Sequence, residues 1–279
     1  MCRMLVLVGG KNGVRRDFRR KLYNSLIRAA RRDPYSRRLF GEDEESHRDG
    51  WGLFAAKIGE AGVESYTVYR SLKPIFEDDV EPPFLAYEGP LVEMIHARAA
   101  STGMPVNMFS VHPVEASSPD GYRLLLIHNG SVDKEGLARA VGASKREKSI
   151  YNDSYFLARF LASRASNLAN ASLFEEAARY TKTAMNIAAF LLSPEKALLV
   201  VGSYYKLLDK PEERRGYYKL YIGRAGGSIV YASSTIVDYY NPAPGYIEWA
   251  EFPNGSFDIY KVSGAEVVYE GRISIGDYQ

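Results

Sequence analysis

The second residue of the chain, Cys2, is its only cysteine and has the properties of a catalytic nucleophile. Removal of Met1 would leave the thiol of Cys2 beside the free α-amine of the mature chain. An α-amine titrates near ~8, so a neutral fraction at physiological pH can take the proton of the thiol, directly or through a water. The structural alternative is a small, easily buried residue that opens a first strand. The residues elsewhere in the chain must decide between the two.

Four further stretches of polar and glycine residues follow Cys2 within the first 155 residues. They are His47-Arg48-Asp49-Gly50-Trp51-Gly52, His96-Ala97-Arg98-Ala99-Ala100-Ser101, His128-Asn129-Gly130 and Asn152-Asp153-Ser154. Behind Met1-Cys2-Arg3, their order and separations resemble the class II glutamine amidotransferases, whose mature chains begin with cysteine. The resemblance implies an α+β fold, the four-layer αββα sandwich of the N-terminal-nucleophile hydrolases. It also implies that residues 1–279 form a single glutaminase domain.

Asn129 and Gly130 are the candidate oxyanion hole. They follow the apolar run Leu124-Leu125-Leu126-Ile127, so we expect them where a buried strand ends and side chains emerge toward a cleft. Attack of a thiolate on the glutamine amide puts negative charge on its oxygen, and loss of one donor to such an oxygen typically costs about 3 kcal/mol. The resemblance assigns the donors to the side-chain amide of Asn129 and the backbone N–H of Gly130. The alternative is that Asn-Gly is only a turn.

Arg98 and Asp153 are the candidate residues for binding the α-carboxylate and the α-ammonium of glutamine. The planar fork of Arg98 can bind a carboxylate bidentately, and the resemblance gives it that role. Its alternative is a surface ion pair. Asp153 matches the ammonium-binding residue of the family, although Asn152-Asp153-Ser154 could equally be an ordinary helix N-cap. Tyr155 occupies a position that is often acidic in the family. The surface ion pair of Arg98 and the helix N-cap at Asp153 both predict a less buried side chain than binding of glutamine does.

His47, His96 and His128 invite a metal interpretation, because histidine is a common zinc ligand and Asp49 could supply a fourth. The three histidines lie far apart with no close ligand pair, so we expect neither a metal nor a cofactor. By the resemblance they support the pocket. The stretch Asp49-Gly50-Trp51-Gly52 predicts a tight turn into an inner strand, with its tryptophan near the pocket. The small-residue stretch 99–107 is either a lid over bound substrate or a plain connecting loop.

The composition is that of an ordinary globular protein, with 46% apolar and 25% charged residues in 279. No apolar run approaches the ~18 residues that span a bilayer, so we expect no membrane association. A single cysteine excludes an internal disulfide framework and indicates a reducing compartment. We therefore expect a cytoplasmic protein.

A basic segment occupies residues 11–38, where eleven lysines or arginines face two aspartates. Phe18, Leu22 and Leu26 recur every four residues, which predicts a helix with an apolar stripe. The simplest interpretation is a solvated basic face that pairs with the acidic run 42–45. The functional alternatives are docking of a separate synthase subunit and binding of nucleic-acid phosphates. We find no nucleic-acid motif, so we expect no nucleic-acid partner.

The remaining periodicity predicts strands, then helices, then strands again, which favours layered sheets covered by helices. Helices are expected over 152–163 and from the capping-box sequence Ser172-Leu173-Phe174-Glu175 toward Leu192. Asn254-Gly255 indicates a hairpin between two late strands. Strands are predicted at 4–8, 52–57, 65–69, 91–97, 122–127, 197–201, 219–222, 229–232, 247–251, 257–262 and 266–269.

Three functions stay open at this point. The favoured one is hydrolysis of the glutamine side-chain amide to glutamate and ammonia through a γ-glutamyl thioester on Cys2. Its ammonia would pass to a separate acceptor or partner, because the motifs and trailing strands leave no room for a synthase domain. The second is hydrolysis of another γ-glutamyl amide by the same chemistry. The third is a non-catalytic binding module that retains the fold.

Overall fold

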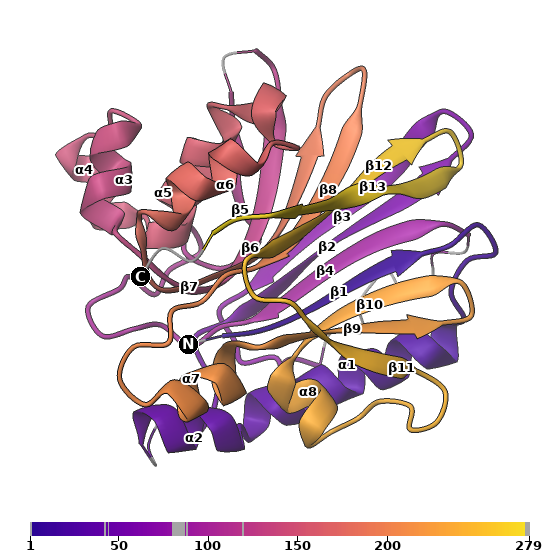
Figure 1. Cartoon of the computed structure of the whole chain (residues 1–279), viewed down its shortest axis with the longest axis horizontal. Coiled ribbons are helices and arrows are strands. Elements are labelled where there is room, and N and C mark those ends of the chain that lie inside the picture. The colour runs from indigo at the N-terminus through magenta and orange to yellow at the C-terminus, as the bar shows by residue number, and fades with distance from the viewer. Residues whose placement is uncertain are drawn as a thin grey trace.

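The computed structural model describes residues 2–41, 43, 45–79, 87, 89–118 and 120–276, and its strands form two antiparallel sheets that face each other (Figure 1). Within these residues, sheet A has seven strands and sheet B has six. The order in sheet A is β11 (Glu248–Phe252), β9 (Leu220–Ala225), β10 (Ser228–Ser233), β1 (Arg3–Gly9), β4 (Leu91–Ala97), β2 (Trp51–Gly59) and β3 (Gly62–Ser71). The order in sheet B is β13 (Glu266–Ser274), β12 (Ser256–Ser263), β8 (Ala197–Ser203), β7 (Thr181–Leu192), β6 (Arg123–Val132) and β5 (Val114–Ser117).

Helices cover the outer faces of both sheets (Figure 1). Those on the side of sheet A are α1 (Arg16–Arg31), α2 (Pro34–Phe40), α7 (Pro211–Tyr218) and α8 (Ser234–Asp238). Those on the side of sheet B are α3 (Lys134–Ala140), α4 (Lys145–Ile150), α5 (Asp153–Ala162) and α6 (Ala171–Ala178), with a short 3₁₀ helix at Ala165–Asn167. This succession of helix, sheet, sheet and helix is the predicted αββα sandwich, and the predicted α+β class is confirmed.

The alternation of side chains along β1 explains the layering on the side of sheet A. Successive residues of a strand point to opposite faces of the sheet. Met4 and Val6 accordingly lie in the apolar core between the two sheets. Leu5 and Leu7 lie in a second core against α1. Both faces of this central strand are buried, so each strand position has a defined side.

The same alternation divides β6 between the inter-sheet core and the helices above sheet B. Leu125 and Ile127 belong to the core between the sheets. Leu124 and Leu126 pack with Phe156 of α5 in a third core. The face on which a later residue of β6 lies therefore follows from its position along the strand.

Helix α1 has the predicted amphipathic form. Phe18, Leu22 and Leu26 are buried against sheet A, and most of the basic residues are exposed. Arg19 is an exception, because its side chain is buried and forms an ion pair with Glu93 of β4 at 3.0 Å. Arg32 pairs with Glu45 at 2.9 Å, which is a predicted contact between the basic segment and the acidic run.

The predicted long helix from Ser172 toward Leu192 is wrong. Helix α6 ends at Ala178, and its N-cap Asn170 makes no side-chain capping bond. Residues 181–192 form β7, which has β6 on one side and β8 on the other. A strand that is buried on both faces has no polar alternation, and periodicity alone cannot distinguish it from a buried helix.

The predicted hairpin at Asn254-Gly255 is also wrong. The strand before it, β11, pairs with β9 in sheet A, whereas the strand after it, β12, pairs with β8 and β13 in sheet B. Asn254 instead exchanges hydrogen bonds with the backbone of Tyr205, at 2.8 and 2.9 Å. The turn therefore carries the chain from one layer to the other.

Candidate active site

The backbone of Cys2 contacts the side chain of Asn129 across the space between the two sheets. Cys2 precedes β1 and continues its alternation on the side of Met4, and Asn129 continues that of Ile127 on β6. The N–H of Cys2 donates a hydrogen bond to Oδ1 of Asn129 at 3.2 Å. The structure thus brings the candidate nucleophile and the candidate oxyanion donor together from different sheets.

The amide of Asn129 has one satisfied and one unsatisfied group. Its Oδ1 accepts from Cys2, whereas its Nδ2 is buried and has no hydrogen-bond partner among the described residues. An unsatisfied buried donor destabilises the folded protein by about 1–3 kcal/mol, so such donors are rare outside functional sites. An unpaired N–H donor on a side chain that binds the backbone of Cys2 is suited to bind the oxygen that becomes charged during acyl transfer.

Gly130 occupies a position that only glycine fits. Its φ is +148°, and a Cβ built there would lie 1.9 Å from the carbonyl oxygen of Ala184 on β7. The pairing of β6 with β7 also shifts by a bulge between Gly130 and Val132. The expectation that Asn129 and Gly130 follow the end of a strand is wrong, because β6 continues to Val132. The bulge, rather than a strand end, interrupts the regular backbone here.

The thiol of Cys2 lies in a buried position at the edge of this site. The residue is 8% exposed, and its Sγ is 3.7 Å from the carbonyl oxygen of Ala99. Burial raises the pKa of the Cys2 thiol, and the positive charge of Arg98 acts against that rise. A thiol with a raised pKa is mostly protonated at neutral pH, so a base must activate it. Met1, whose removal the mechanism requires, lies outside the described residues.

Arg98 is buried directly after β4, which does not fit the surface ion pair weighed as its alternative. Its Nη2 donates to the carbonyl oxygen of Pro105 at 2.9 Å, and its backbone is tied to Asp49 and Gly50 by two bonds of 2.9 Å. Its Nη1 is buried and has no hydrogen-bond partner among the described residues. This guanidinium therefore keeps donor capacity that a carboxylate could use.

Asp153 is the first residue of α5, and the helix N-cap is its neighbour Asn152, whose Oδ1 accepts from the N–H of Tyr155 at 3.0 Å. Asp153 is buried, and its Oδ2 accepts from the N–H of Val132 at 3.0 Å. This bond fixes the carboxylate to the strand end two residues beyond Gly130. The capping role weighed as the alternative for Asp153 therefore belongs to Asn152.

The histidines of the motifs make separate hydrogen bonds. His96 donates from Nε2 to the carbonyl oxygen of His128 at 3.0 Å, and His128 donates from Nε2 to the carbonyl oxygen of Ala184 at 3.1 Å. The Nδ1 of His128 accepts from the hydroxyl of Ser154 at 2.9 Å. His47 lies on the other side of sheet A, bound to Asp33 at 2.8 Å. Burial lowers the pKa of each of the three histidines, which favours their neutral forms.

No group of three or more histidine, cysteine or acidic side chains that could hold a metal ion occurs in the part of the chain that the structure describes. His47 is separated from the inter-sheet space by sheet A, whereas His96 lies within it. The three histidines of the motifs therefore do not converge on one point.

The stretch after His47 supports the turn into β2. Asp49 accepts from the N–H of Ala100 at 2.6 Å, and Gly50 has a φ of +101°. At Gly52 a Cβ would lie 2.2 Å from the carbonyl oxygen of His112. Trp51 is fully buried in the core shared with α1, and its Nε1 donates to Asp78. The tryptophan thus packs on the helix side of sheet A, opposite to the side on which Cys2 and Asn129 meet.

Two buried residues outside the site motifs contact Cys2 or His96. Tyr217 donates its hydroxyl proton to the carbonyl oxygen of Cys2 at 3.3 Å, and it lies 215 residues away along the chain. The ring of His112 is 4.0 Å from that of His96, between centroids. For Tyr217 no local pattern gives a signal, since its position depends on how α7 packs.

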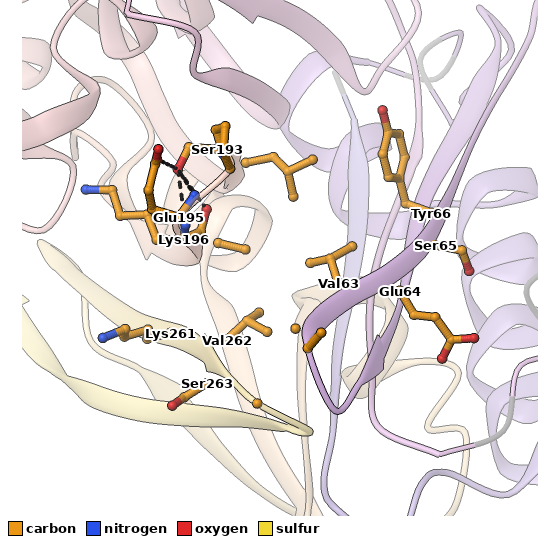
Figure 2. A pocket seen from close by; sticks show the side chains of 16 residues that line it. Val63, Glu64, Ser65, Tyr66, Ser193, Glu195, Lys196, Lys261, Val262 and Ser263 are labelled. Atoms are coloured by element: carbon orange, nitrogen blue, oxygen red, sulfur yellow. Dashed lines mark hydrogen bonds between the residues drawn. The ribbon is translucent and has the colours of Figure 1, made fainter.

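A hollow separate from the candidate site lies at the other end of the sandwich. Figure 2 shows this hollow of about 560 Å³ between the hairpin that contains Val63, the turn that contains Lys196 and the turn that contains Val262. These turns follow the ends of β2, β7 and β12, and Cys2 precedes the start of β1. Because β2 and β1 both pair antiparallel to β4, the end of β2 is remote from Cys2. The hollow is therefore separate from the candidate site.

In the part of the chain that the structure describes, no helix is both long and apolar enough to cross a membrane.

Comparison with known proteins finds similarity in structure only. No protein-family model matches the sequence, and no curated protein sequence matches it. Among solved structures, the chain is similar to glutamine phosphoribosylpyrophosphate (PRPP) amidotransferase from B. subtilis complexed with ADP and GMP, with a TM-score of 0.55 and 17% identity over 96% of this chain and 48% of that one. It is also similar to a structure described as the allosteric regulatory enzyme of purine biosynthesis, with a TM-score of 0.54 and 16% identity over 96% and 48%.

The chain thus spans about half the length of the solved structures that it matches. At this identity the likeness establishes the fold. The predicted αββα sandwich, and the resemblance of the chain to a glutamine amidotransferase, are confirmed at the level of the fold.

Proposed function

We propose that this chain, as a glutaminase domain of the class II amidotransferase type over residues 1–279, hydrolyses the side-chain amide of glutamine to glutamate and ammonia. The observation that carries the proposal is the hydrogen bond from the backbone of Cys2 to the side chain of Asn129, whose Nδ2 donor has no partner among the described residues. The buried guanidinium of Arg98 and carboxylate of Asp153 supply the two charges that complement the amino-acid end of glutamine. Support for the class also comes from the motif order and from the fold.

In the proposed mechanism, the α-amine of Cys2 takes the thiol proton and the sulfur attacks the amide carbon of glutamine. The tetrahedral oxyanion is bound by Nδ2 of Asn129 and the N–H of Gly130. Its collapse breaks the C–N bond, and the nitrogen leaves as ammonia with the proton that the α-amine returns. Water, deprotonated by the same amine, then attacks the γ-glutamyl thioester and releases glutamate and the free thiol.

The loop after Arg98 is the proposed lid. It is tied to Arg98 through Pro105, and Asn107 donates to the carbonyl oxygen of Ile150 at 3.0 Å. A carboxylate that binds the unpaired Nη1 of Arg98 would lie beside the Nη2 group that holds Pro105. Substrate binding would therefore be coupled to the position of the loop, which excludes water from the thioester.

We further propose that the ammonia passes to a separate acceptor subunit that docks on the basic segment 11–38. Exposed basic residues of α1 and α2 provide the charge. The beginning of α2 lies close to Cys2, because Asp33 binds the side chain of Arg3. Reversal of charge at Arg37 and Arg38 should weaken transfer to such an acceptor and leave glutamine hydrolysis by the isolated chain unchanged.

The proposed function is tested by trapping the acyl-enzyme on protein whose intact mass shows that Met1 has been removed. We expect release of glutamate and ammonia from glutamine, and labelling of Cys2 by 6-diazo-5-oxo-L-norleucine, mapped by peptide mass spectrometry. Cys2→Ala should abolish both. Turnover of larger γ-glutamyl amides alone would favour the second function, and no label with any substrate analogue would leave a binding module. Full activity in a chain that keeps Met1 would contradict the mechanism.

A further inference from the structure

The residue after the candidate nucleophile has an unusual environment. Strand alternation places Cys2 toward the other sheet and Arg3 toward the helices that cover sheet A. The side chain of Arg3 is completely buried. A buried guanidinium is strongly unfavourable unless a charge partner and hydrogen bonds compensate for the water that it loses. An arginine at this position therefore requires a dedicated partner.

That partner is Asp33, which is also completely buried. The Nε of Arg3 donates to Oδ2 of Asp33 at 2.5 Å. The same carboxylate accepts from Nε2 of His47 at 2.8 Å and from the hydroxyl of Thr235 at 2.6 Å, and it caps α2 by accepting from two backbone N–H groups. Asp33 thus joins the loop before β2, the first turn of α2 and α8 to the side chain of Arg3.

Tyr217 connects this cluster to the backbone of Cys2. Its carbonyl oxygen accepts from Nη1 of Arg3 at 2.8 Å, and its ring lies under the guanidinium, 3.9 Å from the Cζ atom. Its hydroxyl donates to the carbonyl oxygen of Cys2 at 3.3 Å. One aromatic side chain therefore contacts both residues 2 and 3.

Successive polar groups of the first residues are held in this way. The N–H of Cys2 is bound by Asn129, its carbonyl by Tyr217, and the N–H of Met4 by the hydroxyl of Ser233 at 2.9 Å. Chain termini are ordinarily poorly ordered unless such bonds tie them down. A nucleophile that uses its own terminal amine as a base requires both groups to be fixed, because a displacement of about 1 Å can reduce a rate ~100-fold.

We propose that Arg3, Asp33 and Tyr217 form a positioning network that orients the thiol and the α-amine of Cys2 toward Asn129. The inference deepens the proposed function and rests on it. None of the three residues is assigned contact with the substrate. They act through the backbone of Cys2, which they hold from the helix side of sheet A.

The first test is Tyr217→Phe, which keeps the ring under Arg3 and removes only the hydroxyl that binds Cys2. We expect kcat for glutamine to fall about 5- to 20-fold, as for a modest misalignment of reacting groups, with KM within twofold of the wild-type value. The melting temperature should stay within a few degrees. Tyr218→Phe is the matched control, since this neighbouring tyrosine is equally buried at the end of the same helix, and it should retain wild-type kcat.

The second test measures the reactivity of Cys2 without glutamine. Iodoacetamide alkylation, followed by mass spectrometry across pH 6 to 9, should be faster in Tyr217→Phe and Arg3→Lys than in the wild type, because a loosened terminus exposes the sulfur. A purely structural role would lower the melting temperature, and it would not combine faster alkylation with slower turnover in a stable variant.

Wild-type kcat and wild-type alkylation in Tyr217→Phe would overturn the network. Failure of the proposed function is distinguishable from this result. In that case the wild type would neither hydrolyse glutamine nor react with the diazo-norleucine analogue, whereas the alkylation comparison would still decide whether Tyr217 holds Cys2.

Discussion

The side chain of His96 on β4 donates a hydrogen bond to the backbone carbonyl of His128 on β6, at 3.0 Å, and thereby joins the two sheets one residue before Asn129. Arg98 follows two residues after His96. Arg98, proposed to bind the α-carboxylate of glutamine, follows a strand of sheet A, and Asn129, proposed to bind the oxygen of the side-chain amide, lies in sheet B. The hydrogen bond between His96 and His128 helps to set the distance between Arg98 and Asn129.

Replacement of His96 by leucine should weaken both the fold and the activity. The carbonyl of His128 would be left buried without its donor, which costs about 1–3 kcal/mol of unfolding free energy. We expect a loss of this size in urea denaturation and about a tenfold lower kcat/KM. His96→Gln can still donate and should recover part of both, and a leucine variant equal to the wild type would show that the bond is dispensable.

Asn129→Ala should affect the chemical step more than binding. The variant removes the unpaired Nδ2 donor, and loss of one oxyanion donor typically costs about 3 kcal/mol, or ~100-fold in kcat. Steady-state glutaminase kinetics should show this loss with KM within about threefold. A large rise in KM at unchanged kcat would assign Asn129 to ground-state binding of the substrate.

Arg98→Ala should discriminate between glutamine and an analogue without the α-carboxylate. The guanidinium is proposed to bind that carboxylate, so the variant should raise KM for glutamine at least tenfold, since a charged hydrogen bond is worth about 1.5–3 kcal/mol. Hydrolysis of 4-aminobutanamide, which has an ammonium but lacks the carboxylate of glutamine, is the control. It should be slow in the wild type and change little in the variant, and equal losses on both substrates would point to a structural effect.

Gly130→Ala should be far more damaging than alanine at another glycine with positive φ. The new methyl group would meet the carbonyl of Ala184, so β6 and β7 must move apart beside Asn129. Gly142 has a φ of +66° and open space around it, so Gly142→Ala carries only the cost of backbone strain, about 1–2 kcal/mol. Thermal unfolding and activity of both variants should show the larger loss at Gly130.

The stability of the protein should depend on the ionisation of Asp33 in acid. Burial acts to raise the pKa of Asp33, but Arg3 and the hydrogen bonds of His47 hold it well below its ordinary value. An unfolded aspartate titrates near ~3.9, so below that pH the unfolded chain binds the proton first and the free energy of unfolding falls.

Asp33→Asn tests this dependence. Breaking one partner of a buried ion pair costs about 3–5 kcal/mol, so the variant should be less stable than the wild type by this order at pH 7. Urea denaturation between pH 7 and pH 3 should show that this difference in unfolding free energy narrows below about pH 4, because the unfolded wild type then binds a proton that folded Asp33 does not. If the difference in unfolding free energy between the wild type and Asp33→Asn does not vary with pH, the pKa of Asp33 is not lowered in the folded protein.

Much of the secondary structure could be predicted from local patterns. The apolar spacing of Phe18, Leu22 and Leu26 predicts α1, and the apolar spacing over 152–163 predicts α5. Both signals depend on neighbours within a few turns of the chain. Strand β7 could not be recognised in this way, because its residues are apolar on both faces and only its place inside sheet B distinguishes it from a helix.

The sequence by itself determined the chemical groups of the candidate site. Cys2, Arg98, Asn129 and Asp153 belong to the motifs by which the sequence resembles the class II glutamine amidotransferases, and the order of those motifs is a property of the covalent sequence alone. What only the tertiary structure decided is which groups meet. The unpaired Nδ2 of Asn129, and the contacts of Asp33 and Tyr217 with residues 2 and 3, arise because two sheets and their helices bring together segments up to 215 residues apart, and no local pattern encodes such a meeting.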